Sequence, residues 1–146
     1  MYPIMLDITD KKIIVIGGGR IALRKTRSLL QAGGRVTVIA PRLEEGFKTL
    51  TNVSFVSEKY HSEQLKEAQL IFACTDSKSV NQQIVADAAS WQWVNDCSQK
   101  ENSDFYNMAV LQHETGVVAF SSHGQSPTET KRLKQEIEET LKRQIK

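Results

Sequence analysis

Short apolar runs, each too brief for a helix, recur along the chain between segments with helical spacing. The first run, Ile13–Ile16, is β-branched throughout, which is typical of a strand buried on both faces of a parallel sheet. The amphipathic segment from about 20 to 32 ends at Gly33-Gly34, which predicts a helix. Strands that alternate with helices indicate an α/β fold with a doubly wound parallel sheet. Further strands are predicted at Val36–Ile39, Val53–Ser57, Leu70–Cys74 and Trp93-Val94.

Weaker signals predict the elements between these strands. Leu43–Leu50 indicates a short helix, and Ser62 is a candidate cap for a helical turn. A longer helix is predicted over Ser79–Ser90, with Asp76 or Ser77 as its cap. Before the first strand we expect an extended lead-in that places three apolar residues against the sheet, namely Ile4, Met5 and Leu6.

The carboxy-terminal part carries a different pattern. A polar loop is expected from Asp96 to Ser103, and Val117–Phe120 predicts a sixth strand. Ser126 and Glu129 flank Pro127 in a capping-box pattern that predicts a helix to about residue 144. The apolar stripe of this helix is thin, so the helix packs either on its own sheet edge or on a copy of itself.

Composition excludes several classes of protein. The chain has 146 residues, 40% of them hydrophobic and 25% charged, as is ordinary for one globular domain with at most a short appendage. A net charge of +2 is too small to indicate nucleic acid or membrane as a partner. The first twelve residues lack the pattern of a signal peptide. Two cysteines without metal spacing or disulfide density favour a reducing cytoplasm.

A dinucleotide fingerprint of the form Gly-x-Gly-x-x-Ala follows the first strand. Gly17 permits the tight turn, Gly19 lets a pyrophosphate approach the backbone, and Ala22 lets the helix lie close to the strand. The bland alternative is an ordinary strand–turn–helix connection. Ligands of parallel sheets bind beyond the carboxyl ends of the strands. The predicted cofactor-binding residues are Gly17, Gly18, Gly19, Arg20, Ile21, Ala22, Ala40, Pro41, Thr75 and Asp76.

One part of the fingerprint is absent. The acidic residue that would hold the ribose 2′-hydroxyl at the end of the second strand is replaced by Ala40-Pro41-Arg42. Arg42 suits a 2′-phosphate, so the residues themselves leave the choice between NAD and NADP open.

These residues together resemble the family of precorrin-2 dehydrogenases and sirohaem synthase amino-terminal modules. The resemblance implies a Rossmann-like NAD-binding domain over residues 1–104 and a strand–helix dimerisation segment over 105–146, which makes a homodimer. Family members commonly add a small helical domain, which we expect to be absent here. The matching blocks are Gly17–Pro41, Ala73–Ile84, Val94-Asn95, Ser103–Tyr106 and Val117–Pro127.

The resemblance also implies a reaction, the NAD-dependent oxidation of precorrin-2 to sirohydrochlorin in sirohaem biosynthesis. A family aspartate linked to catalysis falls on Ser98 here, so Asp96 is our hypothesis for the acid/base residue, and Asp104 is the second candidate. The alternative is that Asp96 only caps the loop. The precorrin-2 carboxylates and the matching serine predict substrate contacts from Lys25, Ser122, His123 and Gly124.

Two further readings stay open. One is iron insertion into sirohydrochlorin, or tetrapyrrole binding, without dehydrogenation; some family members insert ferrous iron. The other is a non-catalytic nucleotide-sensing module. The three histidines are scattered and no metal-binding spacing appears, so we expect no bound metal.

Overall fold

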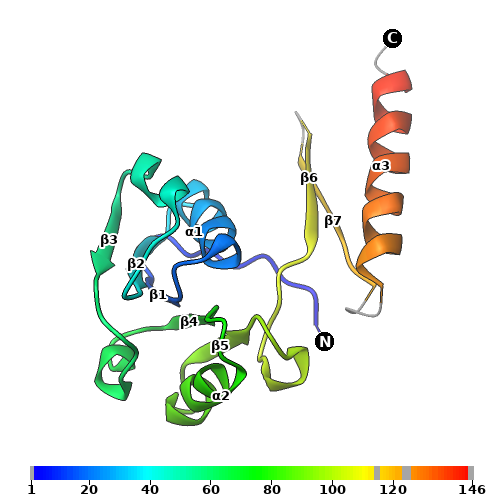
Figure 1. Ribbon diagram of the computed structural model, residues 1–146. Coiled ribbons are helices and arrows are strands. Elements are labelled where there is room, and N and C mark those ends of the chain that lie inside the picture. Colours follow the sequence, from blue (N-terminus) through cyan, green and yellow to red (C-terminus); the bar gives the residue numbers. More distant parts are fainter. Residues whose placement is uncertain (1, 114–115, 123–125, 145–146) are drawn as a thin grey trace. The chain divides into compact units, whose positions relative to one another are not determined.

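The computed structural model describes residues 2–113, 116–122 and 126–144 (Figure 1). Its contacts divide the chain into two compact units, one formed by Tyr2–Phe105 and the other by the residues from Tyr106 onward. The first unit is built around a five-stranded parallel sheet with the strand order β3-β2-β1-β4-β5. The predicted α/β fold with a parallel sheet is therefore confirmed.

All five strands that the apolar runs predict are present in this sheet, with ends that differ by one or two residues. The strands are β1 (Lys12–Ile16), β2 (Arg35–Ile39), β3 (Val53–Val56), β4 (Leu70–Ala73) and β5 (Trp93–Asp96). The connections are α1 (Arg20–Gln31), the 3₁₀ turns η1 (Glu45–Thr49) and η2 (Ser62–Leu65), α2 (Lys78–Asp87) and the 3₁₀ turn η3 (Lys100–Asn102).

The two faces of the sheet carry separate apolar clusters, because successive side chains of a strand point to opposite faces. In β1, Ile13 and Val15 join the cluster under α1, whereas Ile16 joins the cluster under α2. Figure 1 shows these two helices on opposite sides of the sheet. The β-branched run Ile13–Ile16 is thus apolar throughout because both of its faces are covered.

Local chemistry explains where the helices begin and end. Helix α1 stops before Gly33, whose φ of 78° is left-handed, as the glycine pair predicts. Helix α2 is capped by Ser77, whose Oγ accepts a hydrogen bond of 3.3 Å from the backbone N–H of Val80. The prediction of Ser62 as a cap is wrong. His61 occupies that position, and its backbone N–H donates to Gln64 Oε1.

The prediction that the lead-in buries three apolar residues against the sheet is also wrong. Ile4, Met5 and Leu6 are 47%, 89% and 44% exposed. The chain first reaches the sheet at Thr9, which forms an isolated bridge with Gly34. The buried apolar residue is therefore the neighbour of Thr9, Ile8.

The second unit is a hairpin and a long helix. Strands β6 (Ala109–His113) and β7 (Gly116–Phe120) pair antiparallel in a sheet of their own, and α3 (Pro127–Gln144) packs beside them. The strand predicted at Val117–Phe120 is confirmed, whereas β6 was not predicted. The cap is also confirmed, because Ser126 Oγ accepts from the backbone N–H of Glu129. Among the helices of the described residues, none has both the length and the apolar character that a membrane crossing requires.

Candidate active site

The turn from β1 to α1 begins at a glycine that no other residue could replace without strain. Gly17 has a φ of 124°, and a Cβ there would overlap the carbonyl oxygen of Cys74 at the end of β4. Its backbone N–H donates a 2.9 Å hydrogen bond to Ile39 O at the end of β2. Gly17 therefore lets the chain turn where β1 lies between its two neighbouring strands.

Gly18 fixes this turn against the segment that follows β2. A Cβ on Gly18 would overlap the carbonyl oxygen of Arg42 and lie 3.0 Å from the Cβ of Ala40. The carbonyl oxygen of Gly18 also accepts a 2.8 Å hydrogen bond from the backbone N–H of Glu44. Gly18 is thus needed for this close approach between two loops, which the fingerprint does not predict.

Gly19 faces open space at the amino terminus of α1. Apart from its chain neighbours, no heavy atom lies within 4 Å of the position that a Cβ would take. Gly19 is the N-cap residue and makes no side-chain cap, and the first N–H groups of a helix lack partners within the helix. Open space, free N–H groups and the positive end of the helix dipole together fit a diphosphate. Ala22 is fully buried below, whereas Arg20 and Ile21 are exposed.

The end of β2 lies at the same edge of the sheet. Ala40 is buried and its N–H donates to Val56 O, whereas Pro41 and Arg42 are exposed. The nearest acidic residue after the strand is Glu44, whose side chain is exposed. The exposed guanidinium of Arg42 is therefore a charged group beside the position where a ribose 2′-substituent is expected.

The end of β4 is held by a buried amide that the sequence analysis did not single out. Asn81, from the first turns of α2, is fully buried. Its Oδ1 accepts from the N–H and the Oγ1 of Thr75, and its Nδ2 donates to the carbonyl oxygen of Thr75. Thr75 is thereby fixed, while Asp76 beside it is exposed. In the sequence, the signal for this role was the polar residue Asn81 beside the apolar stripe of the predicted helix.

Asp96, at the end of β5, has its carboxylate surrounded by donors. Oδ1 accepts from the N–H and the Oγ of Ser98 and from the N–H of Gln99, and Oδ2 accepts from Asn102 Nδ2. Burial tends to raise the pKa of Asp96, but the hydrogen bonds from Ser98, Asn102 and Gln99 outweigh it and hold the pKa below its usual range. The structure thus gives Asp96 the loop-capping role of the alternative hypothesis, and its acid/base role stays a prediction.

Asp104 closes the base of the same loop. Its Oδ2 accepts a 2.8 Å hydrogen bond from Val94 N–H, and its own N–H donates to Val94 O at 2.9 Å. Ser103 Oγ accepts from the N–H of Asp96 inside this closure. Asp104 is exposed whereas Asp96 is 3% exposed, so the two candidate acids have different surroundings.

Lys25 points inward rather than toward solvent. Its Nζ donates a 3.0 Å hydrogen bond to Asn95 Oδ1 and lies 5.4 Å from the centre of the Phe72 ring. Burial lowers the pKa of Lys25 from its ordinary value. Asn95 is itself 4% exposed and also donates to the carbonyl oxygen of Phe105. The Lys25 ammonium thus has partners within the protein, and its substrate contact stays a prediction.

Ser122, in the second unit, connects the end of β7 to the start of α3. Its Oγ accepts from the N–H of Ser126 and from Thr130 Oγ1, and it donates to Ser126 O. The other predicted substrate contacts of this segment, His123 and Gly124, lie outside the described residues. No group of three or more potential metal ligands occurs in the part of the chain that the structure describes.

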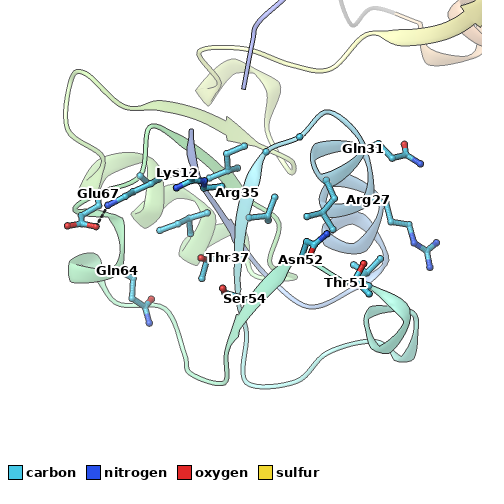
Figure 2. A pocket seen from close by; sticks show the side chains of 18 of the residues that line it. Lys12, Arg27, Gln31, Arg35, Thr37, Thr51, Asn52, Ser54, Gln64 and Glu67 are labelled. Atoms are coloured by element: carbon cyan, nitrogen blue, oxygen red, sulfur yellow. Dashed lines mark hydrogen bonds and ion pairs between the residues drawn. The ribbon is translucent and has the colours of Figure 1, made fainter. Parts of the chain in front are cut away.

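A hollow of about 1220 Å³ lies at the opposite ends of the strands. Figure 2 shows its polar side chains around the amino ends of β1 and β2, with Lys12 paired to Glu67. Arg35, on the same rim, is paired to Asp10. These charges pair with one another instead of converging on a ligand, and the fingerprint glycines are not among the lining residues.

The register of the sheet brings most of the predicted cofactor-binding residues to one edge. Ile16 is paired with Ile39 and with Ala73, and Ala73 is paired with Asp96. The residues that follow these positions therefore leave the sheet side by side. They are Gly17–Gly19, Ala40-Pro41, Thr75-Asp76 and the loop after Asp96.

Comparisons with known proteins agree with this geometry. Residues 4–109 match the model of a family described as putative NAD(P)-binding. The chain is 28% identical over 144 residues to precorrin-2 dehydrogenase of Bacillus subtilis, covering 97% of this chain and 89% of that protein. It is 32% identical to siroheme synthase of Tolumonas auensis, covering 98% of this chain and only 31% of that protein. A solved structure of SirC, a precorrin-2 dehydrogenase, superimposes with a TM-score of 0.86 at 28% identity, covering 96% of this chain and 71% of that one.

Proposed function

The chain belongs to the putative NAD(P)-binding family, and from that premise we propose that it is an NAD-dependent precorrin-2 dehydrogenase, which oxidises precorrin-2 to sirohydrochlorin. The observation that carries the proposal is the open space over Gly19 at the amino terminus of α1. The likeness to relatives named precorrin-2 dehydrogenase supports the choice of substrate. The chain spans about a third of the siroheme synthase that it matches, so the further activities of that longer protein are not assigned to it.

Different residues at the carboxyl ends of the strands would contact different parts of NAD. The N–H groups of the first turn of α1 would hold the diphosphate, and the segment from Ala40 would line the adenosine side. Thr75, fixed by Asn81, would border the opposite side. Bound NAD supplies the acceptor for the hydride that leaves the tetrapyrrole. The task of the protein in this scheme is positioning, since hydride transfer requires the two reacting carbons in contact.

The proton that accompanies the hydride needs an acceptor. We keep Asp96 as the first candidate and Asp104 as the second. A carboxylate with four hydrogen-bond donors and a lowered pKa is a weak base, so a base role for Asp96 requires part of its loop to open. Turnover by Asp96→Asn tests this assignment, and an undiminished rate would show that the proton leaves by another route.

Anaerobic incubation with precorrin-2 and NAD tests the proposed reaction. We expect the absorbance of NADH and of sirohydrochlorin to rise together in equal amounts, and neither to rise when NAD is omitted. The comparison variant is Gly19→Val. It places a side chain in the open space that the diphosphate would occupy, and it should abolish both signals. Normal NAD binding without any oxidation of precorrin-2 would contradict the dehydrogenase proposal.

The Asp96 carboxylate already accepts four hydrogen bonds and is a weak base, which favours an alternative without dehydrogenation. In this alternative the chain inserts iron into sirohydrochlorin or only binds it. Sirohydrochlorin and ferrous iron, without NAD, would then give the absorbance of sirohaem faster than the uncatalysed control. A nucleotide-sensing module would bind NAD and change neither tetrapyrrole. The same set of incubations separates these outcomes from the dehydrogenase.

We further propose that the segment 105–146 forms a homodimer interface and that residues 1–104 form a Rossmann-like NAD-binding domain. Three large apolar side chains of the second unit support this, because Val110, Val117 and Leu133 are 39%, 45% and 47% exposed. An isolated hairpin with one helix buries little apolar surface, so a second copy would complete its core. The cytoplasm is the compartment that we propose, because both cysteines are free thiols.

A further inference from the structure

The two cysteines of the chain lie next to each other at the carboxyl edge of the sheet. Cys74 follows β4 and Cys97 follows β5, and these strands are paired in parallel with Ala73 opposite Asp96. The pairing continues one residue further, because Cys97 N–H donates a 2.9 Å hydrogen bond to Ala73 O. Both side chains contact the apolar cluster under α1, and their Sγ atoms are 2.9 Å apart.

This placement suits a disulfide. Neighbouring strands are about 4.8 Å apart, within the range of about 4.4–6.8 Å that separates the Cα atoms of bridged cysteines. An S–S bond is about 2.05 Å long, so the sulfur atoms would need to approach by less than about 1 Å. Rotation of the two side chains supplies such a movement without any change in the register of β4 and β5.

The two thiols have different surroundings. Cys74 is 6% exposed, whereas Cys97 is half-buried and reachable from solvent. The hydrogen bond from the Cys74 thiol and the nearby Lys25 and Arg24 cations lower the pKa of Cys97, and they outweigh burial and the Asp96 carboxylate, which raise it. The same hydrogen bond and burial raise the pKa of Cys74. Cys97 is therefore the thiol that ionises more readily and is reached from solvent, and Cys74 is the buried thiol beside it.

We propose that Cys74 and Cys97 form a redox-active dithiol, which a peroxide oxidises to an intramolecular disulfide and a small dithiol reduces again. The cysteine that attacks the peroxide is Cys97, and the resolving cysteine is Cys74. Lys25 is a positioning residue. Its ammonium and the Cys97 thiol both donate to Asn95 Oδ1, which keeps the positive charge beside the Cys97 sulfur as the thiol ionises.

The oxidation takes two steps. The Cys97 thiolate attacks one oxygen of hydrogen peroxide, an S–O bond forms, the O–O bond breaks, and the hydroxide that leaves takes up a proton to become water. Cys74 sulfur then attacks the sulfenic sulfur of Cys97, the S–S bond forms and the S–O bond breaks. The second hydroxide leaves as water with the proton of Cys74. Two electrons thus pass from the two thiols to the peroxide, which becomes two molecules of water.

The test uses the full chain, reduced with dithiothreitol, freed of it and then treated with one equivalent of hydrogen peroxide. We expect both free thiols to disappear and the mass to fall by two hydrogens. Peptide mapping should join Cys74 to Cys97 within one chain, and dithiothreitol should restore both thiols. Disulfides only between chains, or two thiols that survive the peroxide, would overturn the proposal.

Matched variants test the order of events. In Cys74→Ser, Cys97 should stop at the sulfenic acid, which dimedone traps, whereas in Cys97→Ser the buried Cys74 should react at least about tenfold more slowly. Equal reactivity of the two single cysteines would contradict the assigned roles. Lys25→Met should move the pH profile of peroxide oxidation to higher pH, a result that a purely structural role of Lys25 would not produce. An unmoved profile would remove Lys25 from the proposal.

Discussion

At the scale of single residues, the three consecutive glycines allow folding and binding to be tested separately. Gly18→Ala should cost about 3 kcal/mol of unfolding free energy, because its Cβ would overlap the carbonyl oxygen of Arg42. Gly19→Ala should cost under about 1 kcal/mol, because its Cβ meets only open space. It should nevertheless raise the Kd for NAD about tenfold, or about 1.4 kcal/mol. Denaturant unfolding and calorimetric titration measure the two effects, and tight NAD binding by Gly19→Ala would contradict the assigned diphosphate position.

Asp96 gives a second prediction at this scale. Asp96→Asn should lose about 1–3 kcal/mol of stability at pH 7, because the charged acceptor of four hydrogen bonds is removed. The pKa of Asp96 is lowered by folding, so its contribution is present above the unfolded pKa of about 3.9 and is lost as the pH falls through the folded value. The stability difference between wild type and variant should therefore shrink below about pH 4. A difference that stays constant into that acidic range would contradict the role of the carboxylate charge.

At the scale of elements, the cap of α2 has a defined contribution. Ser77→Ala removes the acceptor for Val80 N–H and should cost about 1 kcal/mol. Thermal unfolding should detect this as a decrease of roughly 2–4 °C in Tm. Ser28→Ala is the matched control, because Ser28 lies exposed within α1 and its hydroxyl only donates to Arg24 O. Equal effects of the two substitutions would show that Ser77 does not cap α2.

The elements also show which features a sequence can predict. The parallel strands and α1 were predictable because both faces of β1 are covered, which leaves a run such as Ile13–Ile16 without polar interruptions. Strand β6 was not, because it is short, pairs antiparallel with β7 alone and has Leu111 as its one buried residue. The hydrogen bonds of Asp96 could not be predicted either, because its donors Ser98 and Asn102 come together only when the loop folds. The glycine spacing predicted where the turn lies, but not why Gly18 is needed.

At the scale of the whole molecule, the proposed dimer leads to a prediction about assembly. Leu133→Glu places a charge on an apolar side chain of α3 that is 47% exposed, and it should convert a dimer to a monomer. Sedimentation measures this directly. Leu43→Glu is the matched control, because Leu43 is 39% exposed in the first unit and should leave the dimer intact. If both variants sediment as the wild type does, the interface lies elsewhere or the chain is monomeric.

Of the two tryptophans of the chain, Trp93 begins β5 and Trp91 lies two residues before it, and they are 42% and 56% exposed. Their indole fluorescence is emitted at wavelengths that a dihydronicotinamide absorbs and that its oxidised form does not. Arrival of the reduced coenzyme would therefore dim the intrinsic emission, and the oxidised coenzyme would not. The intrinsic tryptophan fluorescence would thus show which form of the coenzyme is bound, without any attached dye.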